Sequence, residues 1–536
     1  MHELPPSDLQ ACLKFRVKTR NGINRLARAA FRYLFTKARL ISVQEIGKVA
    51  DGATESSASV ILYQGKESWV SSEELVLIKN GGKKPYGEVL GVLRKGLGRN
   101  DFLNTQYYKP ELAYVKHGGE PSGAREVFSF AVMVVGEVSE GKPLAINRKI
   151  IAPGSSVSVF EDENPLEIYL KPSARVPAYL CAHLDRHPSW RIPADASYIP
   201  YHVGVYGTTG SGKSWLAKNV LMPFYLENGY DVLVLDWSGM DYAPDLPDNS
   251  IPLSKVFLGP DAILSYLSDI SQNFFDNRSL QGVMEEICDD WDELAKEGPN
   301  GLLKEITKRL DQAGSSVNQN YKSAYLSAVK RFLRRLTPDV LYSLTGTLKV
   351  EDVLTELAKR HLVVIDMAGF RSELKLSFFL ALANAIYSKM IAGEDMSISL
   401  VIDEAPQYSP FKPEGLQVQA TDAIRDLAAL GRKHKLNLTL LSQGVAGDIG
   451  VNAAIRRNLN TNFYGRLHPL DVVGQGGAKE WLEPYGITPE YMLTLQSGQF
   501  YFSGLMNPSP MPLLLFFEPN QRLLRLASER MASTDV

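Results

Sequence analysis

The sequence predicts an α/β protein in which a mostly parallel sheet carries a helical insertion and follows a small β-barrel. Residues 43–160 consist of short β-rich runs separated by turn residues, which is typical of a small barrel or sandwich. After residue 200, buried-strand runs alternate with helical patterns, which indicates a parallel sheet covered on both faces. Residues 260–345 lack strand signals and indicate several helices inserted between the second and third strands of that sheet.

The strand candidates follow from short β-branched and apolar runs bounded by turn residues. In the barrel region they are residues 59–63, 74–78, 89–93, 130–135 and 156–160. In the core they are residues 203–206, 232–235, 362–365, 398–402 and 438–441, with 462–467, 499–503 and 513–517 extending or edging the sheet. We therefore divide the chain into an extension at 1–42, a barrel at 43–165, a core at 166–520 and a tail at 521–536.

The N-terminal extension is basic and amphipathic. Residues 10–44 contain nine basic side chains and no acidic one, and apolar residues recur there at helical spacing. This pattern fits a docked helix with a solvated face, a phosphate-contacting arm or a helix lying on a membrane surface, and the sequence leaves the three open.

The composition is that of an ordinary globular protein. The chain has 536 residues, a formal charge of −2, 45% hydrophobic and 22% charged residues. Its three cysteines lie far apart, which excludes a disulfide framework and a cysteine-based zinc site. No apolar run approaches the ~20 residues of a membrane span, and no signal peptide is evident, so we expect a cytoplasmic protein without an integral membrane segment.

A glycine-rich segment in the core carries the strongest functional signal. Gly207-Thr208-Thr209-Gly210-Ser211-Gly212-Lys213-Ser214 matches G-x-x-x-x-G-K-[ST] at every required position, between a buried strand and an amphipathic helix. The glycines let backbone N–H groups converge on phosphate oxygens, and the helix N-terminus favours the same anion. Lys213 can reach the β- and γ-phosphates and Ser214 can ligate Mg²⁺. The segment therefore predicts a site for ATP with Mg²⁺.

Three predicted core strands end in aspartate, at Asp236, Asp366 and Asp403. The carboxyl ends of parallel strands share one edge of a sheet, so each carboxylate can approach the phosphate loop. Asp403 is followed by Glu404, and we expect Asp403 to hold the Mg²⁺ shell while Glu404 polarises the attacking water. A helix N-cap or a surface loop is the structural alternative, above all for Asp236 and Asp366.

Two further polar residues flank the fifth core strand. Gln443 follows it and can hydrogen-bond the attacking water or the γ-phosphate. Arg432 precedes it, and its planar guanidinium suits a transition-state clamp. The sequence does not decide whether Arg432 acts on its own nucleotide, acts on a neighbour's or is a solvated basic residue; Arg456 and Arg457 are weaker candidates for the clamp.

These motifs resemble, in order, those of the HerA family of the HerA/FtsK superfamily of P-loop motor ATPases. The likeness runs from the phosphate loop to Leu400-Val401-Ile402-Asp403-Glu404-Ala405-Pro406, then through Gly431-Arg432-Lys433, Leu441-Ser442-Gln443 and Asn460-Thr461. The β-rich region resembles the HAS-type barrel of that family, and the 260–345 helices resemble its insertion. The resemblance covers roughly residues 43–520 and implies a RecA-like ATPase core.

The resemblance implies a hexameric, helicase-like ring ATPase that translocates double-stranded DNA. HerA proteins work with the NurA nuclease in DNA end processing and repair, and bacterial relatives serve anti-phage defence with other effectors. By resemblance, Lys213, Ser214, Asp403 and Glu404 form the nucleotide site, Gln443 is the sensor and Arg432 reaches the adjacent subunit. The family shows an acidic-aromatic pair after a glycine beyond Asp236; here Met240 intervenes before Asp241, so the sequence gives no support for an acidic role of Asp241.

Two other classes of function share this motor core. One is a secretion or conjugation motor that moves protein or a single DNA strand, and the other is a nucleotide-gated scaffold that assembles an effector nuclease. A small-molecule kinase is disfavoured, because Asp403, Glu404 and Gln443 point to water as the attacking group. DNA itself has no dedicated reading motif here, and outside the first 100 residues the chain is net acidic; Arg371 is one candidate for a channel contact.

Overall fold

The computed structural model describes most of the chain from Ser42 onward. The predicted basic extension lies outside the described residues apart from its last one. The described residues are 42–81, 86–106, 110–121, 126–139, 144–170, 178–257, 278–336, 340–341 and 347–534.

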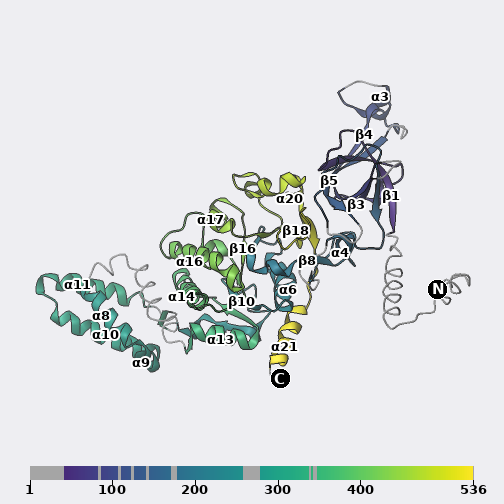
Figure 1. The fold of residues 1–536 in the computed structure, drawn as a ribbon. Coiled ribbons are helices and arrows are strands. Elements are labelled where there is room, and N and C mark those ends of the chain that lie inside the picture. The colour runs from purple at the N-terminus through teal and green to yellow at the C-terminus, as the bar shows by residue number, and fades with distance from the viewer. Residues whose placement is uncertain are drawn as a thin grey trace, which may run out of the picture.

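A closed antiparallel barrel forms the N-terminal unit (Figure 1). Its six strands follow the order β1-β2-β5-β4-β3-β6, which confirms the predicted barrel. The first strand was not predicted, because polar residues and a glycine interrupt its apolar pattern. The strands are β1 (Val43–Val49), β2 (Ser57–Leu62), β3 (Leu75–Asn80), β4 (Gly87–Asn100), β5 (Glu126–Val138) and β6 (Ser156–Phe160).

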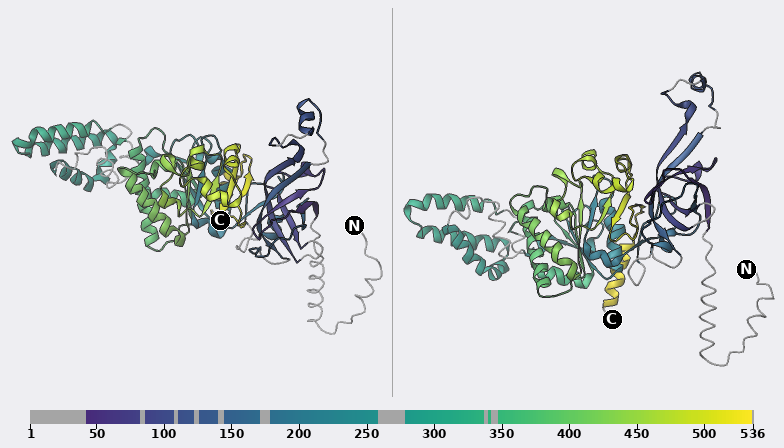
Figure 2. Two further views of the ribbon diagram at one scale, coloured as in Figure 1. Left: turned by 90° about the horizontal axis from the view of Figure 1, so that it is seen from above. Right: turned by 45° about the horizontal axis from the view of Figure 1, so that its top comes forward.

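Two barrel strands extend beyond the barrel wall as an arm. β4 and β5 stay paired out to Asn100 and Glu126, and the short helix α3 (Pro110–Lys116) lies near the tip (Figure 2). The pairing shifts register between Leu93 and Gly96, and such a bulge bends and twists a strand pair. The sequence predicted only the inner halves of these strands, where apolar residues face the barrel core.

The core is built on a nine-stranded sheet of order β11-β14-β10-β15-β16-β9-β17-β18-β19. Neighbours from β11 to β17 pair in parallel, and the last two pairings are antiparallel. This confirms the predicted α/β core; only the three-residue β11 lacked a signal in the sequence. The strands are β9 (Val203–Tyr206), β10 (Asp231–Asp236), β11 (Ser250–Pro252), β14 (Leu362–Asp366), β15 (Ile398–Ile402), β16 (Leu436–Ser442), β17 (Thr461–Tyr464), β18 (Gln499–Gly504) and β19 (Leu513–Phe516).

Alternate residues of the parallel strands face two different apolar cores. In β10, Leu233 and Leu235 pack into the core that includes the helices α14 and α16, whereas Val232 and Val234 pack into the core that includes α6. This alternation is why the strands are apolar throughout. The covering helices are α5 (Lys213–Leu216), continued by a π-helical turn (Ala217–Leu221) and α6 (Met222–Glu227), then α13 (Val350–Arg360), α14 (Ser372–Ile391), α16 (Leu416–Gly431) and α21 (Arg522–Thr534).

Helix α14 is long and apolar enough, by length and composition, to cross a membrane. It is the one such helix in the described part of the chain, and the sequence analysis had found no run of that kind. More than half of its apolar stretch is buried, and it packs against the sheet and α16. Its apolar character is that of a core helix.

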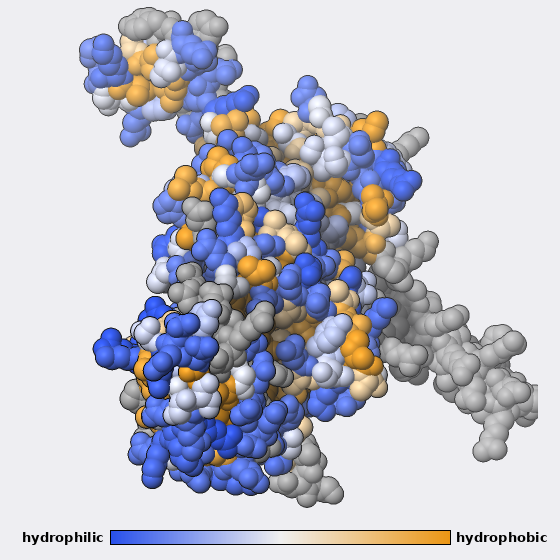
Figure 3. Space-filling model, turned by 90° about the vertical axis from the view of Figure 1, so that its left-hand side faces the viewer, coloured by the Kyte–Doolittle hydropathy of each residue, from blue (hydrophilic) through white to orange (hydrophobic). Residues whose placement is uncertain are grey.

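The helical insertion extends from the core at the end opposite the barrel (Figures 1 and 2). The short strands β12 (Val256–Phe257) and β13 (Leu348–Lys349) pair at its base, so the chain enters and leaves side by side. Viewed from this end, its outer surface is mainly hydrophilic (Figure 3). Its described helices are α8 (Arg278–Asp289), α9 (Trp291–Leu294), α10 (Gly298–Ser316) and α11 (Gln319–Leu333).

A buried arginine joins the barrel to the core. Arg94 of β4 is 1% exposed and donates to the carbonyls of Tyr485 (3.2 Å) and Pro512 (3.1 Å) in the core. It also pairs with Glu73 of the barrel, which accepts a hydrogen bond from the Tyr501 hydroxyl of β18 (3.1 Å). Arg94 and Glu73 of the barrel thus make three hydrogen bonds to the core, and these contacts help to fix the orientation of the barrel on the core.

Candidate nucleotide site

The glycine-rich loop Gly207–Ser214 joins β9 to α5 in a conformation that requires its glycines. Gly210 and Gly212 have φ of +77° and +95°, in the left-handed region where a side chain is strained. A Cβ on Gly207 would lie 2.4 Å from the Ser211 hydroxyl oxygen, so this position also excludes any larger residue. The three glycines of the motif are therefore dictated by the path of the backbone.

Three neighbouring segments hold the loop from outside. Thr208 donates its backbone N–H (2.8 Å) and its hydroxyl (3.2 Å) to the carbonyl of Arg466, just after β17. The N–H of Gly207 donates to Ser442 at the end of β16 (3.1 Å), and the N–H of Gly498 donates to the Ser211 carbonyl (3.0 Å). The loop is thus shaped before any ligand arrives, which is the preorganisation that anion binding requires.

Lys213 is folded back over the loop. The residue is 9% exposed, and its ammonium donates to the carbonyls of Gly207 (2.8 Å) and Thr208 (3.4 Å). Burial lowers the pKa of Lys213, while the charges of Glu404, Asp403 and Asp241 act in the opposite direction. The ammonium therefore lies among the carboxylates that end the neighbouring strands.

The end of β15 presents a buried aspartate followed by a strained glutamate. Glu404 has a φ of +49°, which non-glycine residues rarely adopt and which is frequent at functional sites. Asp403 is 3% exposed, and its carboxylate accepts the backbone N–H of Glu404 (2.9 Å). Burial, reinforced by the charges of Asp241 and Glu404, raises the pKa of Asp403 to about 7. A carboxylate this poorly solvated favours a cation or a proton beside it.

Gln443 connects Glu404 to the phosphate loop. Its side-chain amide donates to the Glu404 carboxylate (2.9 Å) and its carbonyl accepts the hydroxyl of Thr209 (3.3 Å). Glu404 and Gln443 are 39 residues apart, and adjacency of β15 and β16 brings them together. The sequence-predicted residues Lys213, Asp403, Glu404 and Gln443 thus share one edge of the sheet.

Asp236 organises the loop that follows β10. Its carboxylate is fully buried and accepts the N–H groups of Gly239 (2.9 Å), Tyr242 (2.9 Å) and Ala243 (3.0 Å). Asp366, at the end of β14, accepts the N–H of Ala368 (2.9 Å). Both aspartates have backbone partners of the kind that the structural alternative predicted.

Asp241 lies inside the carboxylate group, which the sequence did not indicate. Carboxylate oxygens of Asp236, Asp241 and Asp403 all lie within 4.8 Å of one another. Oxygen donors of this kind suit Mg²⁺, and the shortage of partners at Asp403 fits a cation there. The donor set of Asp403, Asp241 and the Ser214 hydroxyl is chemically suited to the predicted metal.

Arg432 lies at the opposite edge of the sheet from the phosphate loop. It precedes β16, and its guanidinium stacks over the ring of Tyr201 (5.7 Å), which precedes β9. The seven residues of β16 separate it from Gln443 by roughly 20 Å. Arg432 cannot contact the nucleotide of its own chain, which removes one of the three alternatives that the sequence had left open.

Of three other arginines, Arg456 and Arg466 lie beside residues of the loop or next to it. Arg456 donates to the carbonyl of Gly476 (2.9 Å), and its charge acts on the buried Tyr206 at the end of β9. Arg457 is exposed. Arg466, which the sequence analysis missed, holds the loop with its carbonyl and has an exposed side chain. The signal that could have found it is its place just after a strand that pairs with β9.

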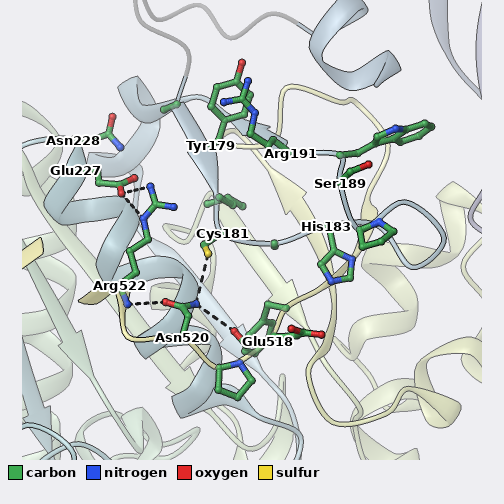
Figure 4. A pocket seen from close by; sticks show the side chains of 17 residues that line it. Tyr179, Cys181, His183, Ser189, Arg191, Glu227, Asn228, Glu518, Asn520 and Arg522 are labelled. Atoms are coloured by element: carbon green, nitrogen blue, oxygen red, sulfur yellow. Dashed lines mark hydrogen bonds and ion pairs between the residues drawn. The ribbon is translucent and has the colours of Figure 1, made fainter. Parts of the chain in front are cut away.

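A surface pocket of about 650 Å³ lies away from this site, beside the amino end of β10 (Figure 4). Its polar groups pair with one another: Arg522 binds Glu227, and the Asn520 amide donates to the sulfur of Cys181 (3.6 Å). The segment leading into α21 forms one wall and the β7–β8 hairpin (Ala178–Leu180 and Ile192–Ala194) another. Its mutually satisfied polar groups make it a poor candidate for the site of chemistry.

Parallel sheet, glycine-rich loop and strand-end carboxylates together define a P-loop NTPase. Residues 183–386 match the family described as the central domain of helicase HerA. This segment is therefore similar to the central domain of HerA-type P-loop ATPases. No curated protein matches the sequence.

Several solved structures are similar to this chain at low identity. VirB4 of Thermoanaerobacter pseudethanolicus is 12% identical, with a TM-score of 0.47 over 66% of this chain and all of VirB4. The bacterial conjugative coupling protein TrwB, lacking its first 70 residues, is 15% identical, with a TM-score of 0.42 over 61% of this chain and 87% of its own. The genome packaging NTPase B204 of Sulfolobus turreted icosahedral virus 2, in complex with ATP-gammaS, is 12% identical, with a TM-score of 0.30 over 60% of this chain and 98% of its own.

Proposed function

We propose that this protein hydrolyses ATP with Mg²⁺ and uses the energy to translocate double-stranded DNA through a ring of identical subunits, a hexamer by family resemblance. The observation that carries the proposal is the line of contacts from Glu404 through Gln443 to Thr209. Thr209 belongs to the segment that matches the HerA central domain. These contacts connect the Glu404 carboxylate, which is suited to activate water, with the loop that is suited to bind the phosphates. A nuclease partner, in DNA end processing or anti-phage defence, belongs to the same proposal.

Each side chain at the site has a separate task in this reaction. Lys213 exchanges its two carbonyl partners for phosphate oxygens, and the loop N–H groups bind the remaining ones. Glu404 orients the attacking water and takes its proton, while Gln443 fixes the position of Glu404. Ser214 and Asp403 would hold the Mg²⁺, which would supply charge neutralisation to the reaction.

The ring explains the position of Arg432. Arg432 lies at the edge of the sheet where the parallel strands begin, here called the amino edge; the phosphate loop lies at the carboxyl edge, where they end. Arg432 can therefore contact a nucleotide only if the carboxyl edge of another subunit faces it. Arginine supplied by a neighbour is an established way to complete a P-loop site. We therefore assign Arg432 to the nucleotide of the adjacent subunit.

Two exposed basic groups support a contact with DNA phosphates. Arg371 is exposed in the loop after β14, at the same edge as the phosphate loop. In the insertion, α11 has three exposed basic residues, Lys322, Lys330 and Arg331, and no acidic one. Contacts of this kind are independent of sequence and sensitive to salt, as a translocating motor needs.

The test is the response of ATP hydrolysis to duplex DNA. We expect turnover to rise with duplex length and the stimulation to fall steeply as salt is raised. Lys213→Ala abolishes turnover with or without DNA, and Arg371→Ala weakens only the stimulation. No stimulation by duplex of any length at low salt would overturn the DNA proposal. Stimulation by single strands or by a protein alone would favour the secretion or conjugation type of motor.

Purification of the native complex tests the partner. We expect a nuclease to co-purify with the wild type and equally with Glu404→Gln. In this proposal the nuclease docks on the barrel, which the substitution does not change. If Glu404→Gln also keeps full effector function, hydrolysis is dispensable and the protein is a nucleotide-gated scaffold.

A further inference from the structure

The loop after β10 is folded around the Asp236 carboxylate. Gly239 has a φ of +70°, which permits the turn, and three successive contacts with backbone N–H groups close the loop over Asp236. At the outer side, Lys218 donates to the carbonyl of Asp241 (2.6 Å) and to the carboxylate of Asp245 (2.5 Å). The loop is therefore fixed from inside and from outside.

The fold of this loop accommodates Met240, the residue that is additional to the family pattern. Met240 is 81% exposed, so the residue that departs from the family pattern bulges into solvent. Asp241 is consequently turned back towards the sheet, where its carboxylate lies with those of Asp236 and Asp403. The departure in sequence thus leaves an acidic side chain at the edge of the site.

A buried hydroxyl points to a ligand in this group. The Tyr242 side chain is fully buried, and its hydroxyl has no hydrogen-bond partner among the described residues. Burial raises the pKa of Tyr242, the charges of Asp403, Asp241 and Asp236 reinforce the shift, and the nearby Ser214 hydroxyl opposes it. A buried hydroxyl without a partner is unfavourable, so this hydroxyl is suited to bind a ligand or a ligand's water.

We propose that Asp241 binds the divalent cation together with Asp403 and Ser214, and that the Tyr242 hydroxyl holds a water of that cation. The inference rests on the proposed ATP and Mg²⁺ site and adds a ligand to it. Asp236 is not a ligand, because backbone N–H groups already occupy both of its oxygens.

The test is Mn²⁺ binding, measured by electron paramagnetic resonance on protein saturated with ADP. We expect Asp241→Asn to weaken Mn²⁺ binding at least tenfold, Asp241→Glu to restore part of it, and Tyr242→Phe to weaken it several-fold. Asp248→Asn is the matched control, because Asp248 is an exposed carboxylate farther along the same segment. ADP affinity measured without any metal stays unchanged in all four variants.

The outcomes separate this inference from the function on which it rests. If Asp403→Asn weakens Mn²⁺ binding and Asp241→Asn does not, the inference is overturned and the ATPase proposal stands. If the wild type binds no nucleotide, the ATPase proposal itself fails. Thermal unfolding shows whether each variant is folded; should Asp241→Asn be unfolded, Asp241→Ser takes its place with the same expected result.

Discussion

The two edges of the nine-stranded sheet hold different buried polar groups. At the carboxyl edge, Asp403 accepts one backbone N–H, and Tyr242 has no partner among the described residues. At the amino edge, His202 is fully buried with both ring nitrogens occupied: Nε2 donates to Ala428 (2.9 Å) and Nδ1 accepts from Leu438 (3.2 Å). Among the described residues, a buried group without a partner also lies at the amino edge, the Asn437 amide oxygen near the start of β16. The carboxyl edge differs in that two such groups, the hydroxyls of Ser211 and Tyr242, lie in the phosphate loop and in the loop after β10.

The largest effect is expected from the glutamate at the carboxyl edge. Glu404→Gln keeps the side-chain shape and removes the base, so turnover falls by about 10⁴-fold while ATP affinity is retained. Steady-state hydrolysis and equilibrium ATP binding measure the two quantities. Turnover within tenfold of wild type would mean that the carboxyl edge does not activate water through Glu404.

Arg432 tests whether the amino edge serves a neighbour. Arg432→Ala lowers turnover by about 10³-fold and leaves the ATP affinity of its own chain unchanged. Mixing Arg432→Ala with Lys213→Ala subunits restores part of the activity. The Arg432→Ala subunit keeps an intact nucleotide site, and the Lys213→Ala subunit provides the arginine to it. Lys433→Ala is the neighbouring control. Unchanged turnover in Arg432→Ala would transfer the role to Arg456, Arg457 or Arg466.

Gln443 is expected to have a smaller effect, because it acts through Glu404. Gln443→Ala releases the glutamate from its amide partner and lowers turnover by about 10²-fold. Thr209→Val removes only the outer contact of the same line and costs less. Hydrolysis rates at saturating ATP distinguish the two. Equal loss in both variants would contradict the order of contacts from Thr209 to Glu404.

His202 is expected to change stability with pH and to leave turnover untouched. Burial lowers the pKa of His202 to about 4, below its ordinary value of 6.5. The unfolded chain then binds the proton first, so stability is complete above pH 6.5 and falls by about 3 kcal/mol as the pH drops to 4. Urea unfolding across this range measures the effect. His202→Gln should give a flatter profile, and an identical slope would contradict the buried neutral imidazole.

Much of the fold was readable from the sequence, because the buried strands are long and continuously apolar. β9 and β15 have the predicted bounds, whereas β11 has too few residues to carry a pattern. β1 was missed because its strand pairing, and not its own composition, keeps it extended.

The parts of the candidate site that are encoded by short contiguous segments could be predicted from the sequence. The phosphate loop follows from one contiguous motif, and Glu404 and Gln443 follow from strand ends. Asp241 was not foreseen, because its position depends on how Asp236 folds the loop in three dimensions. The place of Arg432 could have been predicted: a residue before a parallel strand lies at the edge opposite the residue after it.

The short strand β18 has a mechanical consequence. Directly before it, Gly498 is bonded to Ser211 of the phosphate loop, and within it the Tyr501 hydroxyl is bonded to the Glu73–Arg94 pair of the barrel. A displacement of the loop when phosphate is gained or lost is therefore passed to the barrel through about three residues. The barrel would then report the chemical state of the motor to whatever is docked upon it.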